Sequence, residues 1–360
     1  MLARRTWIAA VQRLAVLFLI PFLYINFREH FGTKQADVGV GISINTWINH
    51  LCPKYSLINT VNKTLNWRPL TPNTIFFTET SCALKFSPRK ACAVESAAHH
   101  YPHRPVLLLV TAPAILHPQP LLQLVEDLDN VEFSYLDLDQ VFSEPPLKSW
   151  HHQRLWLYNE DHAPVFVSDA ARVELLRRYG GTYLDLDIWT LRPLPDFQPY
   201  LGWQTAESVN NDVLSFSPRH HFIQEIVDAI PSVFNPHIRN TIGPTLFTTH
   251  LRQLCPEQLT IPKDINSTVK DTCHGITIYP RRAFSPINLG PSELLSVFLR
   301  GHGLGTKFLK ESTDSYLLHL YNYLSEMLLV KLGGDSILEE VAKRNCPIVY
   351  RYLLTHNMTF

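Results

Sequence analysis

The chain has 360 residues, 46% of them hydrophobic and 18% charged, which is typical of a folded protein with a large core. Its 32 basic and 32 acidic residues cancel, so no overall positive charge marks it as a nucleic-acid-binding protein. An anionic ligand would therefore need a local site or a metal ion rather than a global field.

The N-terminal segment differs from the rest of the chain. Three arginines precede an uncharged run over residues 14–27, and Arg28 closes it. The run is shorter than the ~20 residues of a comfortable membrane span, although it can be extended to about residue 7. A signal anchor, a cleaved signal peptide and a buried helix are the alternatives, and the lack of a small-residue cleavage site after Phe27 favours the anchor. We expect residues 1–13 to be cytosolic, 14–27 to cross the membrane and 28–72 to form a lumenal stem.

Other features agree with entry into the secretory pathway. Asn62, Asn266 and Asn357 each begin an Asn-x-Ser/Thr site for N-glycosylation. The chain also has six cysteines, an even number that suits a lumenal domain with disulfides.

The cysteine spacing suggests two local disulfides. The economical pairs are Cys82–Cys92 and Cys255–Cys273, but spacing leaves the connectivity open, including that of Cys52 and Cys346. Neither Cys-x-x-Cys nor a Cys/His cluster is present to indicate a zinc site.

From residue 73 onward, strand patterns alternate with helix patterns. We expect strands over 74–77, 106–110, 131–136 and 182–184, and helices over 89–101, 121–128 and 165–179. The continuous apolar run Val106–Val110 is typical of a strand covered on both faces. This alternation predicts an α/β domain with a mostly parallel sheet over residues 73–360, less regular in its second half.

The strongest motif is Gly180-Gly181-Thr182-Tyr183-Leu184-Asp185-Leu186-Asp187. The glycines end a helix, and a short strand then leads into two aspartates separated by one residue. Residues i and i+2 of an extended chain point the same way, so Asp185 and Asp187 are expected to face one site. Converging carboxylates repel unless a cation lies near them, and a hard divalent ion that keeps positions open for phosphate oxygens meets that need.

Two other patterns that contain aspartate are weaker evidence for a functional site than Asp185 and Asp187. Asp137-Leu138-Asp139 has the same spacing without the glycines, and we interpret it as a strand-end turn or a helix cap. Asp169 and Arg172 are three residues apart on the expected long helix and share a face. They form either a local ion pair or a pair that grips sugar hydroxyls beside a metal.

These motifs together resemble a sugar-transferase domain shared by certain mannosyltransferases and large glucosylating toxins. The resemblance is closer and longer to the α-1,4-galactosyltransferases that make globotriaosylceramide from lactosylceramide, and it covers about Thr74 to the C-terminus. The segments that carry it are Ile75–Ser81, Cys92–Ala98, Val167–Leu194, Gly243-Pro244, Tyr279-Pro280, Phe284–Ile287 and His319–Asn322.

The resemblance implies a GT-A fold, with a DXD sugar-binding region at about 74–195 and an acceptor-binding region at about 196–360. It implies an Mn²⁺-dependent, retaining transfer of galactose or N-acetylgalactosamine from a UDP-sugar. The acceptor would be a terminal galactose-type residue of a glycosphingolipid, linked α-1,4. The protein would be a single-pass type II protein of the Golgi membrane with a lumenal catalytic domain.

The resemblance also assigns roles by position. Asp187 would bind the metal directly, Asp185 would bridge hydroxyls and the water shell of the metal, and His319 would approach the metal and diphosphate. The donor would further contact Phe77, Thr78, Glu79, Thr80, Asp169, Arg172, Tyr183 and Asn322.

Some positions depart from the family pattern. Tyr323 stands where a basic residue commonly follows His-x-x-Asn, and Asn210-Asn211-Asp212 replaces an Asn-Gly-type turn. We place Asn210, Asn211, Asp212 and Trp203 among the acceptor or nucleophile candidates. Asp212 is the nearest nucleophile candidate, with turn capping as the alternative.

Alternatives remain for individual residues and for the function. Trp203 and His319 are alternatively core residues. For the mechanism, we favour same-face attack assisted by the leaving phosphate over a protein nucleophile. The other functions are transfer of N-acetylglucosamine or N-acetylgalactosamine to glycoprotein glycans, or carbohydrate binding without catalysis. The sequence does not indicate an oligomeric state.

Overall fold

A computed structural model describes residues 62–360, with gaps at 84, 113, 160, 196–198, 257–267, 289 and 302. These residues belong to one compact unit, Trp47–Phe360. The expected cytosolic tail and membrane segment lie outside the described residues, as does most of the expected stem. In the part of the chain that the structure describes, no helix is both long and apolar enough to cross a membrane.

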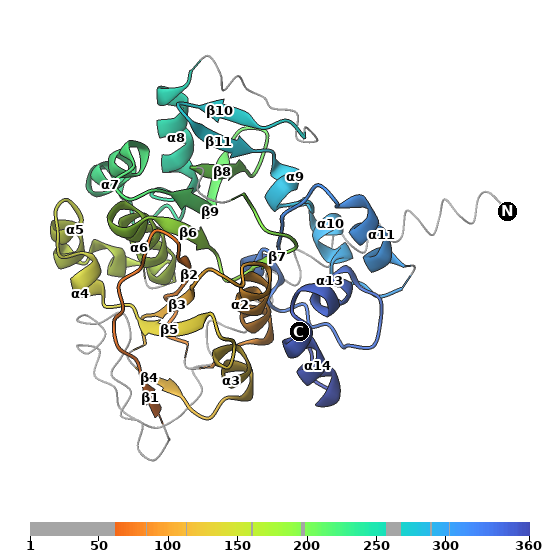
Figure 1. Ribbon diagram of the computed structural model, residues 1–360. Helices are drawn as coiled ribbons and strands as arrows, with labels where there is room; N and C mark the ends of the chain where they lie inside the picture. Colours follow the sequence, from red (N-terminus) through yellow and green to blue (C-terminus); the bar gives the residue numbers. More distant parts are fainter. Residues whose placement is uncertain are drawn as a thin grey trace. The chain divides into compact units, whose positions relative to one another are not determined.

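An eight-stranded mixed sheet forms the centre of this unit, in the order β10-β11-β8-β9-β6-β2-β3-β5 (Figure 1). Its strands are β2 (Ile75–Glu79), β3 (Val106–Val110), β5 (Val131–Tyr135), β6 (Gly181–Leu184), β8 (Tyr200–Trp203), β9 (Val209–Phe216), β10 (Asp271–Cys273) and β11 (Ile276–Tyr279). The pairs β6–β2, β2–β3, β3–β5 and β11–β8 are parallel, and the other three are antiparallel. The expected α/β domain with a mostly parallel sheet is confirmed.

Side chains of the central strands alternate between two cores. Ile75 and Phe77 of β2 face the core that contains α2 (Pro88–His100), whereas Phe76 faces the core that contains α6 (Ala163–Tyr179). Burial on both faces explains why these strands read as continuous apolar runs.

Further helices cover both faces of the sheet. On the α2 side lie α3 (Pro120–Glu126), α13 (Ile337–Asn345) and α14 (Pro347–Thr355), and on the α6 side lie α5 (Leu147–Gln153), α7 (His221–Val233) and α8 (Pro244–Leu254). The shorter elements are β1 (Asn62–Thr64), β4 (Ala114–Leu116), α4 (Leu138–Val141), η2 (Leu155–Tyr158), β7 (Ile188–Thr190), α9 (Arg281–Phe284), α10 (Pro291–Ser296), α11 (Leu304–Glu311), β12 (Leu317–His319) and α12 (Asn322–Ser325).

The ordered packing of the unit begins earlier than the expected boundary at residue 73. β1 pairs with β4, and the backbone carbonyl of Asn66 accepts a hydrogen bond from Tyr135 N of the edge strand β5. Leu65 and Leu70 are buried. The end of the expected stem therefore protects a sheet edge, which requires backbone pairing but no sequence period.

The two described disulfides correct one expected pair. Cys255–Cys273 is found as expected, but Cys92 pairs with Cys346, so the expected Cys82–Cys92 pair is wrong. Cys92 lies in α2 and Cys346 lies between α13 and α14, which pack on α2. Cys82 is also disulfide-bonded.

Candidate active site

The two glycines of the motif set the position of β6. Gly180 ends α6 with φ of 67°, and Gly181 begins β6 with φ of 110°. A Cβ atom on Gly181 would lie 2.6 Å from the carbonyl oxygen of Thr74. Glycine is thus required both for the backbone conformation and for the close approach of β6 to β2.

Asp185 and Asp187 lie in a tight turn between β6 and β7. The amide of Asp185 donates to Asp212 O of β9 at 2.9 Å, and the amide of Ile188 donates back to Asp185 O at 3.0 Å. These bonds fix the turn to the sheet, so the two carboxylates follow the carboxyl end of a buried strand, as expected.

Strand pairing brings the C-terminal part of the chain to this turn. β12 runs antiparallel to β7, with His319 opposite Ile188. The amide of Leu320 donates to Asp187 O at 3.0 Å, and the amide of Asn322 donates to Asp187 Oδ2 at 2.8 Å. His319 and Asn322 therefore join Asp187, as the resemblance implied.

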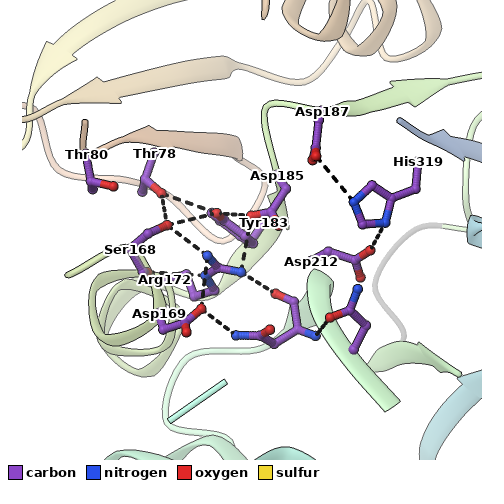
Figure 2. Close-up of polar contacts among 12 residues, drawn as sticks. Thr78, Thr80, Ser168, Asp169, Arg172, Tyr183, Asp185, Asp187, Asp212 and His319 are labelled. Carbon is purple, nitrogen blue, oxygen red and sulfur yellow. Dashed lines mark hydrogen bonds and ion pairs between the residues drawn. The ribbon is translucent and has the colours of Figure 1, made fainter. Parts of the chain in front are cut away.

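The imidazole of His319 lies between two carboxylates (Figure 2). Its Nε2 is 3.4 Å from Asp187 Oδ2, and its Nδ1 is 2.9 Å from Asp212 Oδ2. The second contact is an ion pair rather than a well-aligned hydrogen bond. Burial opposes a charge on His319, but the two aspartates outweigh it and raise its pKa well above the ordinary value. The two aspartates therefore favour the charged form of the imidazole.

Arg172 occupies the centre of the other half of the site (Figure 2). Its guanidinium lies 3.1 Å from Oδ1 of Asp169 and 3.1 Å from Oδ1 of Asp185, and it donates to Asn211 O at 2.8 Å. Asn211 in turn donates from Nδ2 to Asp169 Oδ1 at 2.9 Å. The pair Asp169/Arg172 is therefore more than a local helix contact, because it links α6 to β9 and to the turn that carries Asp185 and Asp187, here called the DXD turn.

Hydroxyl groups continue this network towards β2. Tyr183 OH donates to Asp185 Oδ1 at 2.5 Å, and it lies 3.2 Å from the hydroxyl of Thr78, which is 2.9 Å from Ser168 Oγ. Thr78 and Tyr183 are buried. They hold the Asp185 side chain in place from beneath the turn.

The two aspartates of the motif have opposite pKa shifts. Burial raises the pKa of Asp185 to about 7, with the charge of Asp187 adding to the effect and Arg172 opposing it. Burial also acts to raise the pKa of Asp187, but His319 and the amide of Asn322 outweigh it and lower that pKa. The two carboxylates repel each other, so a cation bound near them would stabilise the charged form of both.

These residues fit a divalent metal ion in part. Asp185 and Asp187 provide hard oxygen ligands, and their side chains are 28% and 16% exposed, so a ligand can reach them. His319 does not fit the expected ligand role, because both of its ring nitrogens face carboxylate oxygens. Within the described ranges, no group of three or more His, Cys, Asp or Glu side chains is arranged to hold a metal.

Several expected contact residues lie away from the carboxylates or inside the core. Phe77 is fully buried in the α2-side core, so its side chain is not placed to contact a nucleotide. Trp203 is buried, and its indole N–H donates to Asp271 Oδ2 at 2.8 Å, in agreement with the alternative that it is a core residue.

Other candidates are engaged with neighbouring groups of the protein. Glu79 pairs with Lys90 and accepts from Ser81, and Thr80 donates to Pro164 O at 2.7 Å. Asn210 accepts through Oδ1 from the amide of Asn211 at 3.0 Å. These contacts position the loops around the carboxylates.

The remaining sequence expectations concern the surface and the second Asp-x-Asp pair. Asp137 accepts from the amide of Gln140 at 3.1 Å and caps α4, which confirms the interpretation as a helix cap. Asn62 lies in β1, Asn357 is exposed after α14, and Asn266 lies outside the described residues.

Sequence reasoning missed Arg89, which supports the site from α2. Its guanidinium donates to Asn322 Oδ1 at 3.2 Å, to Ser325 O at 2.9 Å and to Leu328 O at 2.5 Å. Burial lowers the pKa of Arg89 to about 10, with the carboxylates of Glu326 and Asp187 opposing this. No motif signals these contacts, because the partners are more than 230 residues away in the sequence.

Comparison with protein families gives two matches that divide the chain. Residues 87–207 match a glycosyltransferase sugar-binding region containing a DXD motif, and residues 215–353 match an alpha 1,4-glycosyltransferase conserved region. The first region holds Asp169, Arg172, Asp185 and Asp187, and the second holds His319.

Curated relatives are similar over most of the chain. Lactosylceramide 4-alpha-galactosyltransferase of Rattus norvegicus is 28% identical over 358 residues, which cover 94% of this chain and 91% of the relative. Alpha-1,4-N-acetylglucosaminyltransferase of Homo sapiens is 28% identical over 300 residues, which cover 78% of this chain and 80% of the relative.

Solved structures show weaker similarity. The PaToxG glycosyltransferase has a TM-score of 0.41 at 16% identity and covers 59% of this chain and 76% of its own. The galactosyltransferase LgtC in complex with donor and acceptor sugar analogs has a TM-score of 0.34 at 14% identity, with 69% and 87% covered. The two family matches, with the DXD turn and its partners in place, show that this chain is a glycosyltransferase with a DXD sugar-binding region and an alpha 1,4-glycosyltransferase conserved region.

Proposed function

We propose that this enzyme transfers galactose or N-acetylgalactosamine from a UDP-sugar, in α-1,4 linkage and with retention, to a terminal galactose-type residue of a glycosphingolipid such as lactosylceramide. The observation that carries the proposal is the convergence of Asp185, Asp187, Arg172 and His319 at the end of β6. The relatives named for lactosylceramide support the acceptor class.

The described side chains suit the departure of a diphosphate. The ring of His319 is held between Asp187 and Asp212, and its positive charge would help to offset the negative charge that develops on the leaving group. Arg172 keeps Asp169 and Asp185 in position to accept hydrogen bonds from sugar hydroxyls. Mn²⁺ bound by Asp187 and Asp185 would supply positive charge that offsets the charge developing on the departing UDP.

The geometry at Asp212 supports same-face attack over a covalent intermediate at this residue. Asp212 is buried, and its Oδ2 lies against His319. This carboxylate therefore serves to orient the imidazole. We propose that the acceptor hydroxyl attacks from the face on which UDP leaves.

The second candidate is transfer of N-acetylglucosamine, in α-1,4 linkage, to glycoprotein glycans. The human alpha-1,4-N-acetylglucosaminyltransferase favours it, because its identity to this chain equals that of the rat galactosyltransferase. The intact set of carboxylates and cations around the DXD turn argues against the alternative of a carbohydrate-binding protein without catalysis.

We further propose a single-pass type II protein of the Golgi membrane, based on the uncharged run over residues 14–27 and the arginines before it. Glycosidase digestion of intact and permeabilised vesicles tests this orientation. Protection of the N-glycans in intact vesicles is expected, and their removal without permeabilisation would contradict it.

A donor and acceptor panel tests the proposed reaction. The purified chain is incubated with UDP-galactose, UDP-N-acetylgalactosamine or UDP-N-acetylglucosamine, with and without Mn²⁺, and with lactosylceramide or a glycoprotein glycan. Asp187→Asn should abolish Mn²⁺-dependent UDP binding and lower transfer by roughly 100-fold or more, while the fold is kept. The matched control is Asp137→Asn in the second Asp-x-Asp pair, which should behave like the parent chain. Wild-type UDP affinity in Asp187→Asn would contradict the proposed site.

A further inference from the structure

Large apolar side chains are exposed on two segments that meet beside the active site. Tyr323, Leu324, Met327 and Leu329 are 56%, 50%, 62% and 70% exposed, and Ile238 is 54% exposed. The guanidinium of Arg239 lies 4.6 Å from the ring centroid of Tyr323 and joins the two segments. We call Ile238, Arg239, Tyr323, Leu324, Met327 and Leu329 the apolar rim.

The backbone beneath the rim is tightly held. Arg89, itself buried, donates to Ser325 O, Ser325 Oγ and Leu328 O. Ser325 and Val330 are buried and Leu328 packs against the core, whereas the side chains of Tyr323, Leu324, Met327 and Leu329 are exposed. Their exposure is therefore a property of an ordered segment, and exposed apolar clusters of this kind mark interaction surfaces.

Both segments of the rim end at groups of the active site. Asn322, which precedes Tyr323, donates its amide proton to Asp187 Oδ2. Gly243, four residues after Arg239, approaches Asp169 so closely that a Cβ would lie 2.8 Å from Oδ2. A surface that docks on the rim is thus brought next to the site where the sugar is transferred.

The charge of the rim points to lipid. Arg239 forms no direct ion pair with a carboxylate in the described ranges, although its charge acts on the buried Asp169, and its guanidinium rests on Tyr323. The exposed acidic residue of the segment is Glu326. Its negative charge raises the pKa of Arg89 and is therefore partly offset by that guanidinium. Apolar side chains with an aromatic ring and a cation at their edge match the acyl boundary and the phosphates of a lipid headgroup layer.

We propose that the apolar rim rests on the bilayer that carries the acceptor, so that the sugar end of a glycolipid reaches Asp187 and His319. This inference rests on the proposed function, because a membrane-bound acceptor must enter the site from the membrane side. A peripheral contact of this size would be weak alone, since only a few apolar side chains take part in it. It would orient a protein that is already held near the bilayer.

A fluorescence experiment tests the contact without reference to activity. The full chain carrying Leu329→Cys is labelled with bimane and reconstituted in phosphatidylcholine–phosphatidylserine vesicles that contain a nitroxide-labelled lipid. We expect strong quenching at position 329 and little at the matched control Val269→Cys, an exposed apolar position before β10. Equal quenching at both positions, or none at 329, overturns the proposal and leaves a protein partner as the occupant.

An acceptor comparison tests the consequence for transfer. The variant with Leu324→Ser, Met327→Ser and Leu329→Ser should lose roughly tenfold in transfer to the glycolipid in vesicles, because membrane attraction falls with apolar area. Its transfer to a water-soluble glycoside with the same sugars should stay within about twofold of the parent, which also shows that it is folded. Equal loss with both acceptors overturns the proposal. Should the parent chain transfer no sugar to any glycolipid, the proposed function fails, and the quenching result still decides whether the rim contacts lipid.

Discussion

Asp212 and His319 form a buried ion pair, with Asp212 Oδ2 2.9 Å from His319 Nδ1. Because Nε2 of the same ring faces Asp187, the imidazole is held from both sides and its orientation is fixed. His319 is therefore positioned by β9 as well as by its own strand, β12.

Replacing Asp212 with Asn should reduce transfer about 10- to 100-fold, the usual effect of losing a group that orients a functional side chain. The variant keeps the size of the side chain but removes the charge that faces the imidazole. Steady-state transfer and thermal unfolding measure the effect. The control is Asp314→Asn, which removes a half-exposed ion pair with Arg282 and should change neither quantity appreciably. An Asp212→Asn enzyme with the parent rate would show that this pair is not needed.

Replacing Gly181 with Ala should destabilise the protein by roughly 2–4 kcal/mol, since it combines an unfavourable positive φ with a steric clash against Thr74 O. Urea unfolding measures the change. Gly275→Ala is the matched control, because Gly275 has φ of 82° but no atom within 4 Å of its Cβ position. It isolates the conformational cost of about 1–2 kcal/mol. Equal destabilisation by the two substitutions would refute the close approach of β6 to β2.

Glu95, which lies outside the active site, should make the stability of the folded protein depend on pH. It accepts hydrogen bonds from the amides of Ile348 and Val349 at the start of α14, but burial raises its pKa from 4.5 to about 7. The folded state therefore binds a proton more readily than the unfolded state between these values. Stability from this group falls as pH rises from about 4.5 to about 7, by at most about 1.4 kcal/mol per pH unit.

The Glu95→Gln variant should lose this component of the pH dependence. Urea unfolding of parent and variant at several pH values between 4.5 and 7 gives the difference. Glu225→Gln changes an exposed glutamate of α7 and serves as the control, with a profile parallel to that of the parent. A Glu95→Gln profile that also parallels the parent would contradict the raised pKa.

Arg89→Met should loosen the segment that carries Asn322. The carbonyl groups of Ser325 and Leu328 would lose their donor, at a cost of about 1–3 kcal/mol for each buried group left unsatisfied. Hydrogen exchange should become faster over residues 322–330, and UDP binding should weaken. Arg300→Met, at an exposed arginine that contacts Leu332 O at 3.3 Å, is the control. Unchanged exchange over 322–330 in Arg89→Met would show that this segment is held by other contacts.

The first half of the fold could be predicted because its signals are local. Val106–Val110 forms β3 with the expected limits, and the glycines at 180 and 181 end α6 and start β6 as the motif indicated. Burial of β2 and β3 on both faces leaves a continuous apolar run, and a positive φ requires glycine. Such constraints can be read from a few adjacent residues.

What escaped prediction depends on contacts between distant parts of the chain. The Cys92–Cys346 bridge spans 254 residues, and Arg89 binds a segment beyond residue 320. Phe77 was expected to contact a nucleotide, but the alternation of β2 turns its ring into the α2-side core. His319 was correctly placed beside Asp187, yet its second carboxylate partner, Asp212, comes from a strand whose role no spacing reveals.

The pairing of β12 with β7 has a consequence for biosynthesis. β7 emerges from the ribosome well over a hundred residues before the strand that completes its two-stranded sheet and supplies His319. During that interval its edge is open, and a nascent chain has the DXD turn without its imidazole. A chain that stops before residue 317 would therefore have neither the strand that pairs with β7 nor the imidazole that faces Asp187, and the open edge of β7 would be free to pair with other chains.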